Sequence, residues 1–265
     1  MEPESAPFIA LHDAVISRSG REILHIDDLV LARGESVAIL GPNGAGKSTF
    51  VQLITREVLP LHRETPPVLF LGQERVTLEE VKQHVGYVSS TMQAQISVHL
   101  PTLRIVEGGF FGALGVPLRR TVTSEQEAKA LEVMASLGIA DLAERDVMTL
   151  SSGQARRVLI ARALVHDPEA LLVDEPCTGL DPRGMFYLRQ TMRSVSQSGK
   201  SLLLVTHYLE DIVPEITRVI LIKEGRVLAD GTKADILTSE RISDLFDCDL
   251  RVVRNGEYYN LQMQY

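Results

Sequence analysis

The chain has 265 residues, of which 45% are hydrophobic and 23% charged, and its net charge is −8 with a sequence pI near 5.4. This composition is that of a globular protein and excludes a fibrous or wholly disordered chain. The acidic balance argues against a broad nucleic-acid-binding surface, which needs clustered Lys and Arg, so we expect no nucleic-acid partner. A local phosphate site remains compatible with it, because a few main-chain amides can bind phosphate on an acidic protein.

The sequence shows no signal for secretion or for a membrane span. Only Cys177 and Cys248 occur, far apart in the chain, which favours a reducing cytosol over a disulfide framework. The first residues, MEPESAPFIA, carry acids where a secretory signal carries bases. No apolar run approaches the roughly 18 residues that a spanning helix needs. We therefore expect a cytoplasmic chain whose membrane-spanning partner, if it has one, is another protein.

The first half of the chain opens with segments typical of β-strands, namely FIALHDAVI, ILHIDDLVL and SVAIL within residues 8–40. SVAIL is continuously apolar, as a strand buried on both faces is, and leads through GPNGAGKST into the helical pattern FVQLITREVL. Further on, ALLVDEP and SLLLVTH have the same buried-strand pattern, with a helical stretch between them, and RVILIKEGRVLADG predicts a closing hairpin. Alternating buried strands and helices predict an α/β fold with a mostly parallel, doubly wound sheet.

The middle of the chain is different, because its stretches SEQEAKALEVMASLGI and SGQARRVLIARALV are helical and the first begins with a capping box at Thr123 and Ser124. We interpret this part as a helical subdomain inserted into the α/β core. The predicted organisation is a single domain over 1–265, with a core and β-subdomain at 8–91 and 166–240, a helical subdomain at 92–165 and a C-terminal tail at 241–265.

A glycine-rich loop satisfies the pattern G-x-x-x-x-G-K-[ST] between a predicted strand and a predicted helix. Its glycines let main-chain amides wrap phosphates, Lys47 supplies charge for the β- and γ-phosphate oxygens, and the Ser48 hydroxyl can take a Mg²⁺ position. The alternative, a glycine-rich turn that binds nothing, is disfavoured by the strand and helix on either side. The predicted nucleotide-binding residues of this loop are Gly41, Pro42, Asn43, Gly44, Ala45, Gly46, Lys47, Ser48 and Thr49.

Two adjacent acids end the apolar segment at 170–173. Asp174, at the tip of the strand, can hold the Mg²⁺ shell through water. Glu175, one residue further, can accept a proton from a water aimed at the γ-phosphate. By themselves two such acids could form a solvated turn, but the phosphate loop in the same chain favours the catalytic interpretation.

Four short motifs together resemble the ATP-binding proteins of the ABC transporter family. Residues 150–154, LSSGQ, resemble the family's signature and precede the Walker-B-like acids at 174–175. Residues 179–181 resemble its D-loop, and Thr206 with His207 resembles its switch histidine. The motifs occur in the family's order, and the resemblance covers nearly the whole chain. Segments such as VSSTMQ and GGFFGALG resemble the branch of molybdenum-transport or photorepair-type ATPases, which is close to iron-complex importer ATPases.

The resemblance implies a RecA-like P-loop NTPase core with an N-terminal antiparallel β-subdomain and an inserted helical subdomain. It implies ATP and Mg²⁺ as cofactors, with Lys47, Glu175 and His207 acting in hydrolysis. It also implies a head-to-tail homodimer with two ATP molecules at the interface, in which one subunit's signature caps the other subunit's nucleotide. The residues implied for that contact are Ser151, Ser152, Gly153, Gln154 and Asp181. The amides that open the helix after LSSGQ agree with an anion site, and they equally suit a plain helix start.

The chain departs from the family pattern in three places. Residues 17–20 contain no aromatic side chain for adenine, so Arg18 is either a guanidinium that stacks on the base or an exposed loop residue. The strand GYV is followed by serines instead of the usual glutamine. Gln93 and Gln95 come shortly after, and of the two we choose Gln93 as the Mg²⁺- and permease-coupled residue. Ser152 replaces the first glycine of the signature, which keeps the amides at the helix start.

We therefore expect the ATP-hydrolysing subunit of an ABC transporter that powers a separate integral membrane permease. An importer is favoured, since exporters of the family often fuse membrane helices to the ATPase. A substrate-binding protein is a further candidate partner, and the chain is expected at the inner face of the membrane through its permease. The alternative is a soluble ABC ATPase with a regulatory or repair role. A P-loop kinase or GTPase is disfavoured, because those proteins lack a signature loop before the two acids.

Overall fold

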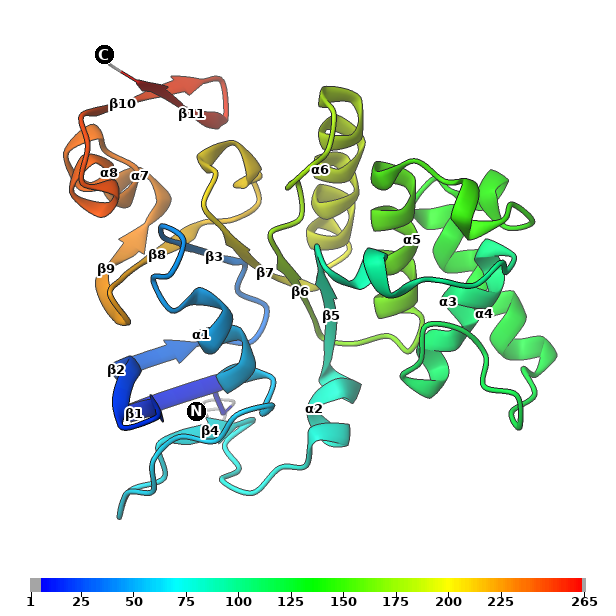
Figure 1. Cartoon of the computed structure of the whole chain (residues 1–265), viewed down its shortest axis with the longest axis horizontal. Helices are drawn as coiled ribbons and strands as arrows, with labels where there is room; N and C mark the ends of the chain where they lie inside the picture. The colour runs from blue at the N-terminus through cyan, green and yellow to red at the C-terminus, as the bar shows by residue number, and fades with distance from the viewer. Residues whose placement is uncertain (1–5, 264–265) are drawn as a thin grey trace, which may run out of the picture. The chain divides into compact units, whose positions relative to one another are not determined.

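The computed structural model describes residues 6–263, so the acidic residues at the extreme N-terminus, in which the sequence carries no readable motif, lie outside the described part. The chain forms two compact units. Unit 1 combines Met1–Val81 with Leu203–Tyr265, and unit 2 is Lys82–Leu202. Figure 1 labels the helices and strands of both units.

The N-terminal part of unit 1 is a three-stranded sheet in the order β2-β1-β4. β1 (Ile9–Arg18) and β2 (Arg21–Leu31) form an antiparallel hairpin, and β4 (Val68–Phe70) pairs antiparallel with the start of β1. The two-residue turn between β1 and β2 has positive φ at both Ser19 (51°) and Gly20 (75°), which suits the twist of a hairpin. The predicted β-rich start is confirmed. The third strand was not predicted, since three residues are too few to show a periodic pattern.

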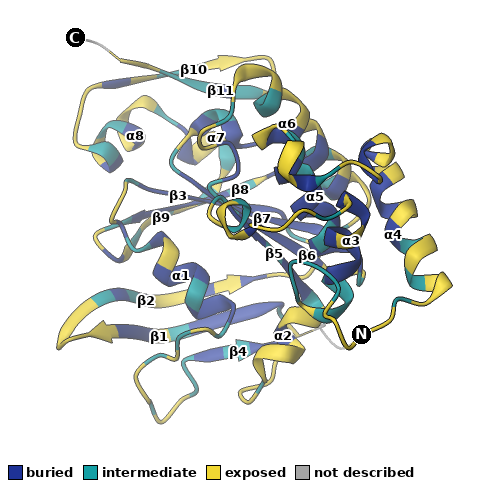
Figure 2. Ribbon diagram, turned by 45° about the vertical axis from the view of Figure 1, so that its right-hand side comes forward, coloured by how far each residue is buried: buried dark blue, intermediate teal, exposed yellow. Residues whose placement is uncertain are grey.

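The second sheet of unit 1 is built around one short, fully buried strand. β3 (Val37–Leu40) lies between β7 (Ser201–Thr206) and β8 (Arg218–Lys223), parallel to both, and β9 (Arg226–Thr232) pairs antiparallel with β8. All four side chains of β3 are 0% exposed, and Figure 2 shows β3 and β7 buried along their length and β8 buried except at its two ends. Burial on both faces requires continuous apolar runs, which is why the sequence identified these strands.

The remaining elements of unit 1 are the helix after the phosphate loop and the short elements of its C-terminal part. The helix after the loop, α1 (Lys47–Ile54), is shorter than the apolar pattern predicted. It ends because Arg56 takes a positive φ of 62° and the Glu57 amide donates to the Gln52 carbonyl at 2.8 Å, which closes the last turn. The C-terminal tail forms a two-stranded hairpin beside a short helix (Figure 1). The hairpin consists of β10 (Leu250–Asn255) and β11 (Tyr258–Met263), and the helix is α8 (Ser239–Phe246). Two further short elements of unit 1 are η5 (Leu209–Asp211) and α7 (Lys233–Ile236).

Unit 2 joins a parallel strand pair to a group of helices. β5 (Val85–Ser89) and β6 (Ala170–Asp174) are in parallel register, with Ser89 opposite Asp174. The helices around them are α3 (Thr102–Glu107), α4 (Ser124–Ser136), α5 (Ser152–Leu164) and α6 (Pro182–Gln197), with α2 (Leu78–His84) at the boundary of the two units. α5 is buried on most of its surface and packs against α3, α4 and α6, whereas α4 keeps an exposed face (Figure 2).

The predicted start of α4 is confirmed, because Thr123 and Gln126 bond each other's main-chain amides in a capping box. The segment predicted as a helical subdomain contains α3, α4 and α5. Its boundaries at 92 and 165 stay a prediction. Within residues 6–263, no helix is both long enough and apolar enough to cross a membrane.

Candidate functional site

The glycine-rich loop lies at the carboxyl end of β3 in unit 1. Leu40, the last residue of β3, is in register with Thr206 of β7 and with Leu221 of β8. The loop therefore leaves the sheet beside the end of β7, where His207 follows. In open α/β sheets, ligands bind outside the carboxyl ends of the parallel strands, and the loop and His207 share that edge.

The turn between β8 and β9, which comes much later in the chain, is hydrogen-bonded to this loop. Gly225, in the β8–β9 turn, donates its amide to the Ala45 carbonyl at 2.9 Å and accepts from the His25 amide at 2.7 Å. Its φ of 77° and its closeness to β2 exclude any side chain, since a Cβ there would lie 2.4 Å from the Ile23 carbonyl oxygen. Main-chain contacts from β2 and the β8–β9 turn thus fix the loop.

The loop brings several polar groups together at the start of α1. Lys47 is only 6% exposed, and its ammonium donates to the carbonyls of Gly41 at 2.8 Å and Pro42 at 3.0 Å. Ser48 is exposed at the start of α1, while Thr49 is buried. A nucleoside triphosphate with Mg²⁺ is bound by main-chain amides, an ammonium and an exposed hydroxyl at the start of one helix. The residues of this loop therefore fit both the nucleotide and the metal ion.

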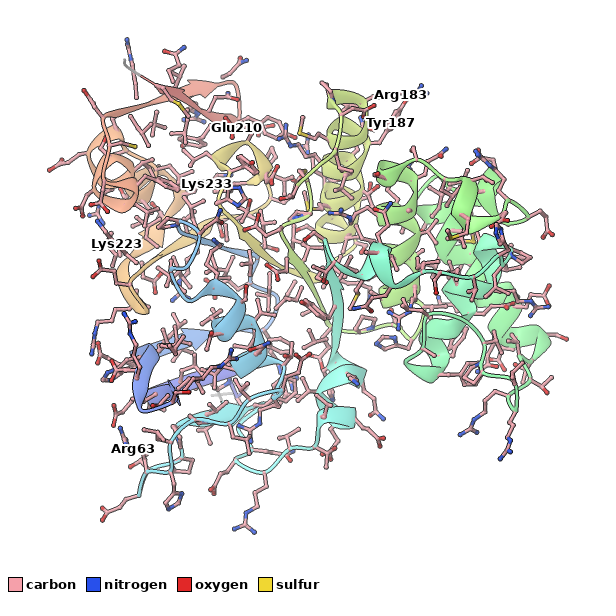
Figure 3. The ribbon with its side chains drawn as sticks, in the orientation of Figure 1. Arg63, Arg183, Tyr187, Glu210, Lys223 and Lys233 are labelled. Carbon is pink, nitrogen blue, oxygen red and sulfur yellow. The ribbon has the colours of Figure 1, made fainter. Side chains whose placement is uncertain are left out.

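His207 follows β7 in a turn that several contacts hold in place. The Thr206 hydroxyl donates to Asp211 Oδ2 at 3.1 Å and accepts from the Tyr208 amide at 3.1 Å. The rings of His207 and Tyr208 lie 3.9 Å apart between centroids. Glu210 accepts from the Leu261 amide at 3.2 Å, so the C-terminal hairpin is tied to the turn, as the position of Glu210 in Figure 3 shows. The tail therefore stabilises the segment that carries His207.

The two acids lie in unit 2, at the end of β6. The Ser90 amide donates to the Asp174 carbonyl at 3.1 Å, which joins the ends of β5 and β6. Glu175 has a φ of 52°, which is uncommon for a residue other than glycine and costs on the order of 1–3 kcal/mol. The following Pro176 restricts the same residue further. The Thr178 hydroxyl donates to Glu175 Oε2 at 3.2 Å and so fixes the direction of the carboxylate.

The signature residues and Asp181 lie at the starts of two neighbouring helices of unit 2. Ser151 is the N-cap of α5 and forms a capping box with Gln154, whose side-chain oxygen accepts from the Ser151 amide at 3.1 Å. Asp181 is the N-cap of α6 and accepts from the Gly184 amide at 2.6 Å. A Cβ on Gly153 would lie 2.9 Å from the Gly184 Cα, so the two helix starts approach through their glycines.

Two predicted contacts have weaker geometric support. Gln93 lies half-buried in a 3₁₀ turn, Met92–Gln95. The β5 residue that is in register with Asp174 is Ser89, so the strand pairing does not itself bring Gln93 to that acid. The role of Gln93 therefore stays a prediction. Arg18 is exposed, and its guanidinium donates to Gln52 Oε1 on α1 at 2.6 Å, which places it over the helix that follows the phosphate loop.

The sequence patterns missed three residues that shape these sites, namely Gly225, Thr178 and Arg156. Thr178 carried a weak signal, since a hydroxyl three residues after Glu175 can close a turn. Arg156 carried a stronger one, because it occupies a core-facing position of the α5 pattern together with Leu159 and Ile160. Gly225 gave only the signal of a hairpin turn, and its contact with the phosphate loop is long-range.

Comparison with known proteins decides the family. The family model described as ABC transporter matches residues 24–178, more than half of the chain. The chain belongs to the ABC transporter family. It is 31% identical over 254 residues to the uncharacterized ABC transporter ATP-binding protein YlmA of Bacillus subtilis, covering 94% of each chain. It is 37% identical over 219 residues to the cobalt import ATP-binding protein CbiO of Rhodobacter capsulatus, covering 80% of this chain and 75% of that one.

The fold agrees with this ABC membership. A solved structure of a putative metal-chelate type ABC transporter in an inward-facing conformation superposes with a TM-score of 0.80 at 21% identity, covering 98% of both chains. The predicted fold class, an α/β P-loop NTPase with an antiparallel β-sheet near its N-terminus, is thereby confirmed. As a member of the family's ATP-binding proteins, this ABC chain binds ATP.

Proposed function

We propose that this chain hydrolyses Mg-ATP and uses the energy to drive a separate membrane permease. The observation that carries the proposal is the phosphate loop, which β2 and the β8–β9 turn hold rigid beside the end of β7. Main-chain amides held at that edge would position a γ-phosphate with little further reorganisation, and positioning with charge stabilisation is most of what phosphoryl transfer requires.

Each predicted residue has a role in this proposal. Lys47 and the loop amides bind the β- and γ-phosphate oxygens. Ser48, Gln93 and, through water, Asp174 would hold Mg²⁺, which would supply charge neutralisation on the phosphate oxygens. Glu175 accepts the proton of the attacking water, and its bond from Thr178 supports a fixed direction for that carboxylate. His207 orients the water and senses the γ-phosphate.

A homodimer completes the proposed mechanism. The amides at the start of α5 are an anion site, so Ser151, Ser152, Gly153 and Gln154 of one subunit would cap the nucleotide of the other. Asp181 fits the same interface, since Gly153 and Gly184 bring the two helix starts together. ATP binding closes the dimer and hydrolysis reopens it.

The names of the relatives favour transport over a regulatory or repair role. The Rhodobacter capsulatus relative is named as a cobalt import protein, which supports an importer in which a permease spans the membrane and this chain works at the membrane's inner face. A substrate-binding protein would belong to the same assembly.

Size-exclusion chromatography of Glu175→Gln with and without Mg-ATP tests the proposal. Removing the proton acceptor while keeping the shape should preserve ATP binding, stop hydrolysis and accumulate a dimer. Lys47→Ala is the control and should neither bind ATP tightly nor shift. A Glu175→Gln protein that hydrolyses ATP at the normal rate would remove Glu175 from the mechanism. One that binds ATP and stays monomeric would overturn closure by the chain alone.

A further inference from the structure

Arg156 is a buried cation on α5 that the proposed mechanism does not use. The residue is 4% exposed, and burial lowers the pKa of its guanidinium. Within residues 6–263, no carboxylate forms an ion pair with it. A buried charge is costly unless hydrogen bonds satisfy it, so its partners must account for its presence.

Those partners are the main-chain carbonyls of two consecutive residues. Arg156 Nη1 donates to the Pro176 carbonyl at 2.5 Å and to the Glu175 carbonyl at 3.3 Å, 20 and 19 residues along the chain. Both bonds come from one nitrogen, which carries two N–H donors in the guanidinium plane at the end of a long side chain; an ammonium lacks that planar geometry, and the amide of Gln is uncharged and on a shorter side chain. Both bonds fall on the residue pair that contains the proposed proton acceptor.

The Glu175 main chain needs such support. Its φ of 52° and the proline that follows it both disfavour the conformation, and strained residues persist only where the surroundings hold them. The guanidinium fixes the carbonyls, while the Thr178 hydroxyl fixes the carboxylate from the other side at 3.2 Å. Main chain and side chain of Glu175 are thus held by different residues.

We propose that Arg156 is a positioning residue that acts through Glu175. In this role Arg156 links the start of the signature helix to the proton acceptor. The proposal rests on the function proposed above, in which Glu175 activates water. Arg156 comes two residues after Gln154 of the capping box, so a ligand that moves the start of α5 also moves the group that holds Glu175. Arg156 does not itself touch the nucleotide in this scheme.

Steady-state and single-turnover ATP hydrolysis by the full chain, together with ATP-binding affinity, test the proposal in Arg156→Gln and Arg156→Lys. A misplaced catalytic group costs about 10²-fold in rate, so Arg156→Gln should lower kcat by roughly that factor. Its KM and its ATP affinity should stay within about 3-fold, since binding groups are untouched. Arg156→Lys keeps the charge and should recover only part of kcat.

Arg162 provides the matched control on the same helix. It is also partly buried, burial also lowers its pKa, and its Nε donates to the Ala113 carbonyl at 2.7 Å, away from Glu175. Arg162→Gln should lose comparable stability in a urea titration and keep kcat within about 3-fold. Equal losses of kcat in the two variants would reduce Arg156 to a packing residue and overturn the proposal.

The Glu175→Gln background separates this inference from the proposed function. Because Arg156 acts through the carboxylate, Arg156→Gln should add no further loss to the residual rate of Glu175→Gln. Additive losses would contradict the inference alone. If Glu175→Gln itself hydrolyses ATP normally, the proposed function fails first. If Glu175→Gln is inactive while Arg156→Gln keeps full kcat, only the positioning role is wrong.

Discussion

Each unit carries its own set of proposed site residues, and the two sets are held in place by different means. In unit 1 the phosphate loop is fixed by main-chain contacts, from Gly225 to Ala45 and from His25 to Gly225. In unit 2 the turn of Glu175 is fixed by the side chains of Arg156 and Thr178. Main-chain contacts depend on the absence of a side chain at close approaches, whereas the second arrangement depends on particular side chains.

The two units also differ in what their buried or partly buried cationic side chains contact. The ammonium of Lys47 donates to carbonyls of its own loop, beside the proposed phosphate site. Unit 2 buries guanidinium groups on carbonyls far along the chain, Arg156 on residues 175 and 176 and Arg162 on residue 113. We conclude that the proposed phosphate-binding half is held by main-chain contacts, while the half with the proposed proton acceptor is held by bonds that single side-chain changes can remove.

The largest expected effect tests the half that main-chain contacts hold. Gly225→Ala places a Cβ against the Ile23 carbonyl, and overpacking of this kind costs about 1–3 kcal/mol. If that cost falls on the binding-competent loop, ATP affinity drops roughly 5- to 150-fold. Isothermal titration with ATP measures it.

Gly34 offers the matched control for that variant. Its φ is also 77°, but nothing lies within 4 Å of an added Cβ. Gly34→Ala therefore carries the same backbone strain without the clash and should leave ATP affinity unchanged. Equal losses of affinity in both variants would mean that backbone strain, and not the support of the loop, is responsible.

A middle-sized effect tests the half that side chains hold. Asp181→Ala and Thr123→Ala each remove an N-cap in unit 2, and each should lower the free energy of unfolding by about 1 kcal/mol. Only Asp181→Ala should also slow ATP turnover, because Asp181 lies at the proposed dimer contact. Chemical denaturation and an ATPase assay on both variants make the comparison. Unchanged turnover in Asp181→Ala would leave it as a cap alone.

The smallest effect concerns pH and a half-buried histidine of unit 2. Burial lowers the pKa of His166 and is the largest cause; the Lys82 main chain acts in the opposite direction, nearby Arg162 and Lys200 lower the pKa further, and Asp167 raises it slightly. The unfolded chain therefore takes up a proton first as the pH falls below about 6.5, so the free energy of unfolding decreases there. His166→Gln should remove that decrease in urea titrations at about pH 8 and about pH 5.5. The exposed His62→Gln is the control, and a profile unchanged by His166→Gln would refute the assignment.

The sequence by itself determined the local units of this protein. The strand, glycine loop and helix at 37–54 follow one another without interruption, and their pattern is set by neighbouring residues. The same holds for the buried strands, the helix start at Thr123 and the acids at the end of β6. Periodicity and capping act over a few residues, so a sequence shows them directly. The family motifs extended this to the roles predicted for Glu175 and His207, which the proposed variants test.

The tertiary structure alone decided how those local units are supported. The β4 strand joins its sheet by pairing with residues almost 60 positions earlier, and Gly225 reaches the phosphate loop across 180 positions. The bonds of Arg156 to residues 175 and 176 and the approach of Gly153 to Gly184 likewise join distant segments. Such contacts depend on how whole elements pack, and no local pattern encodes which backbone will face a given glycine or guanidinium.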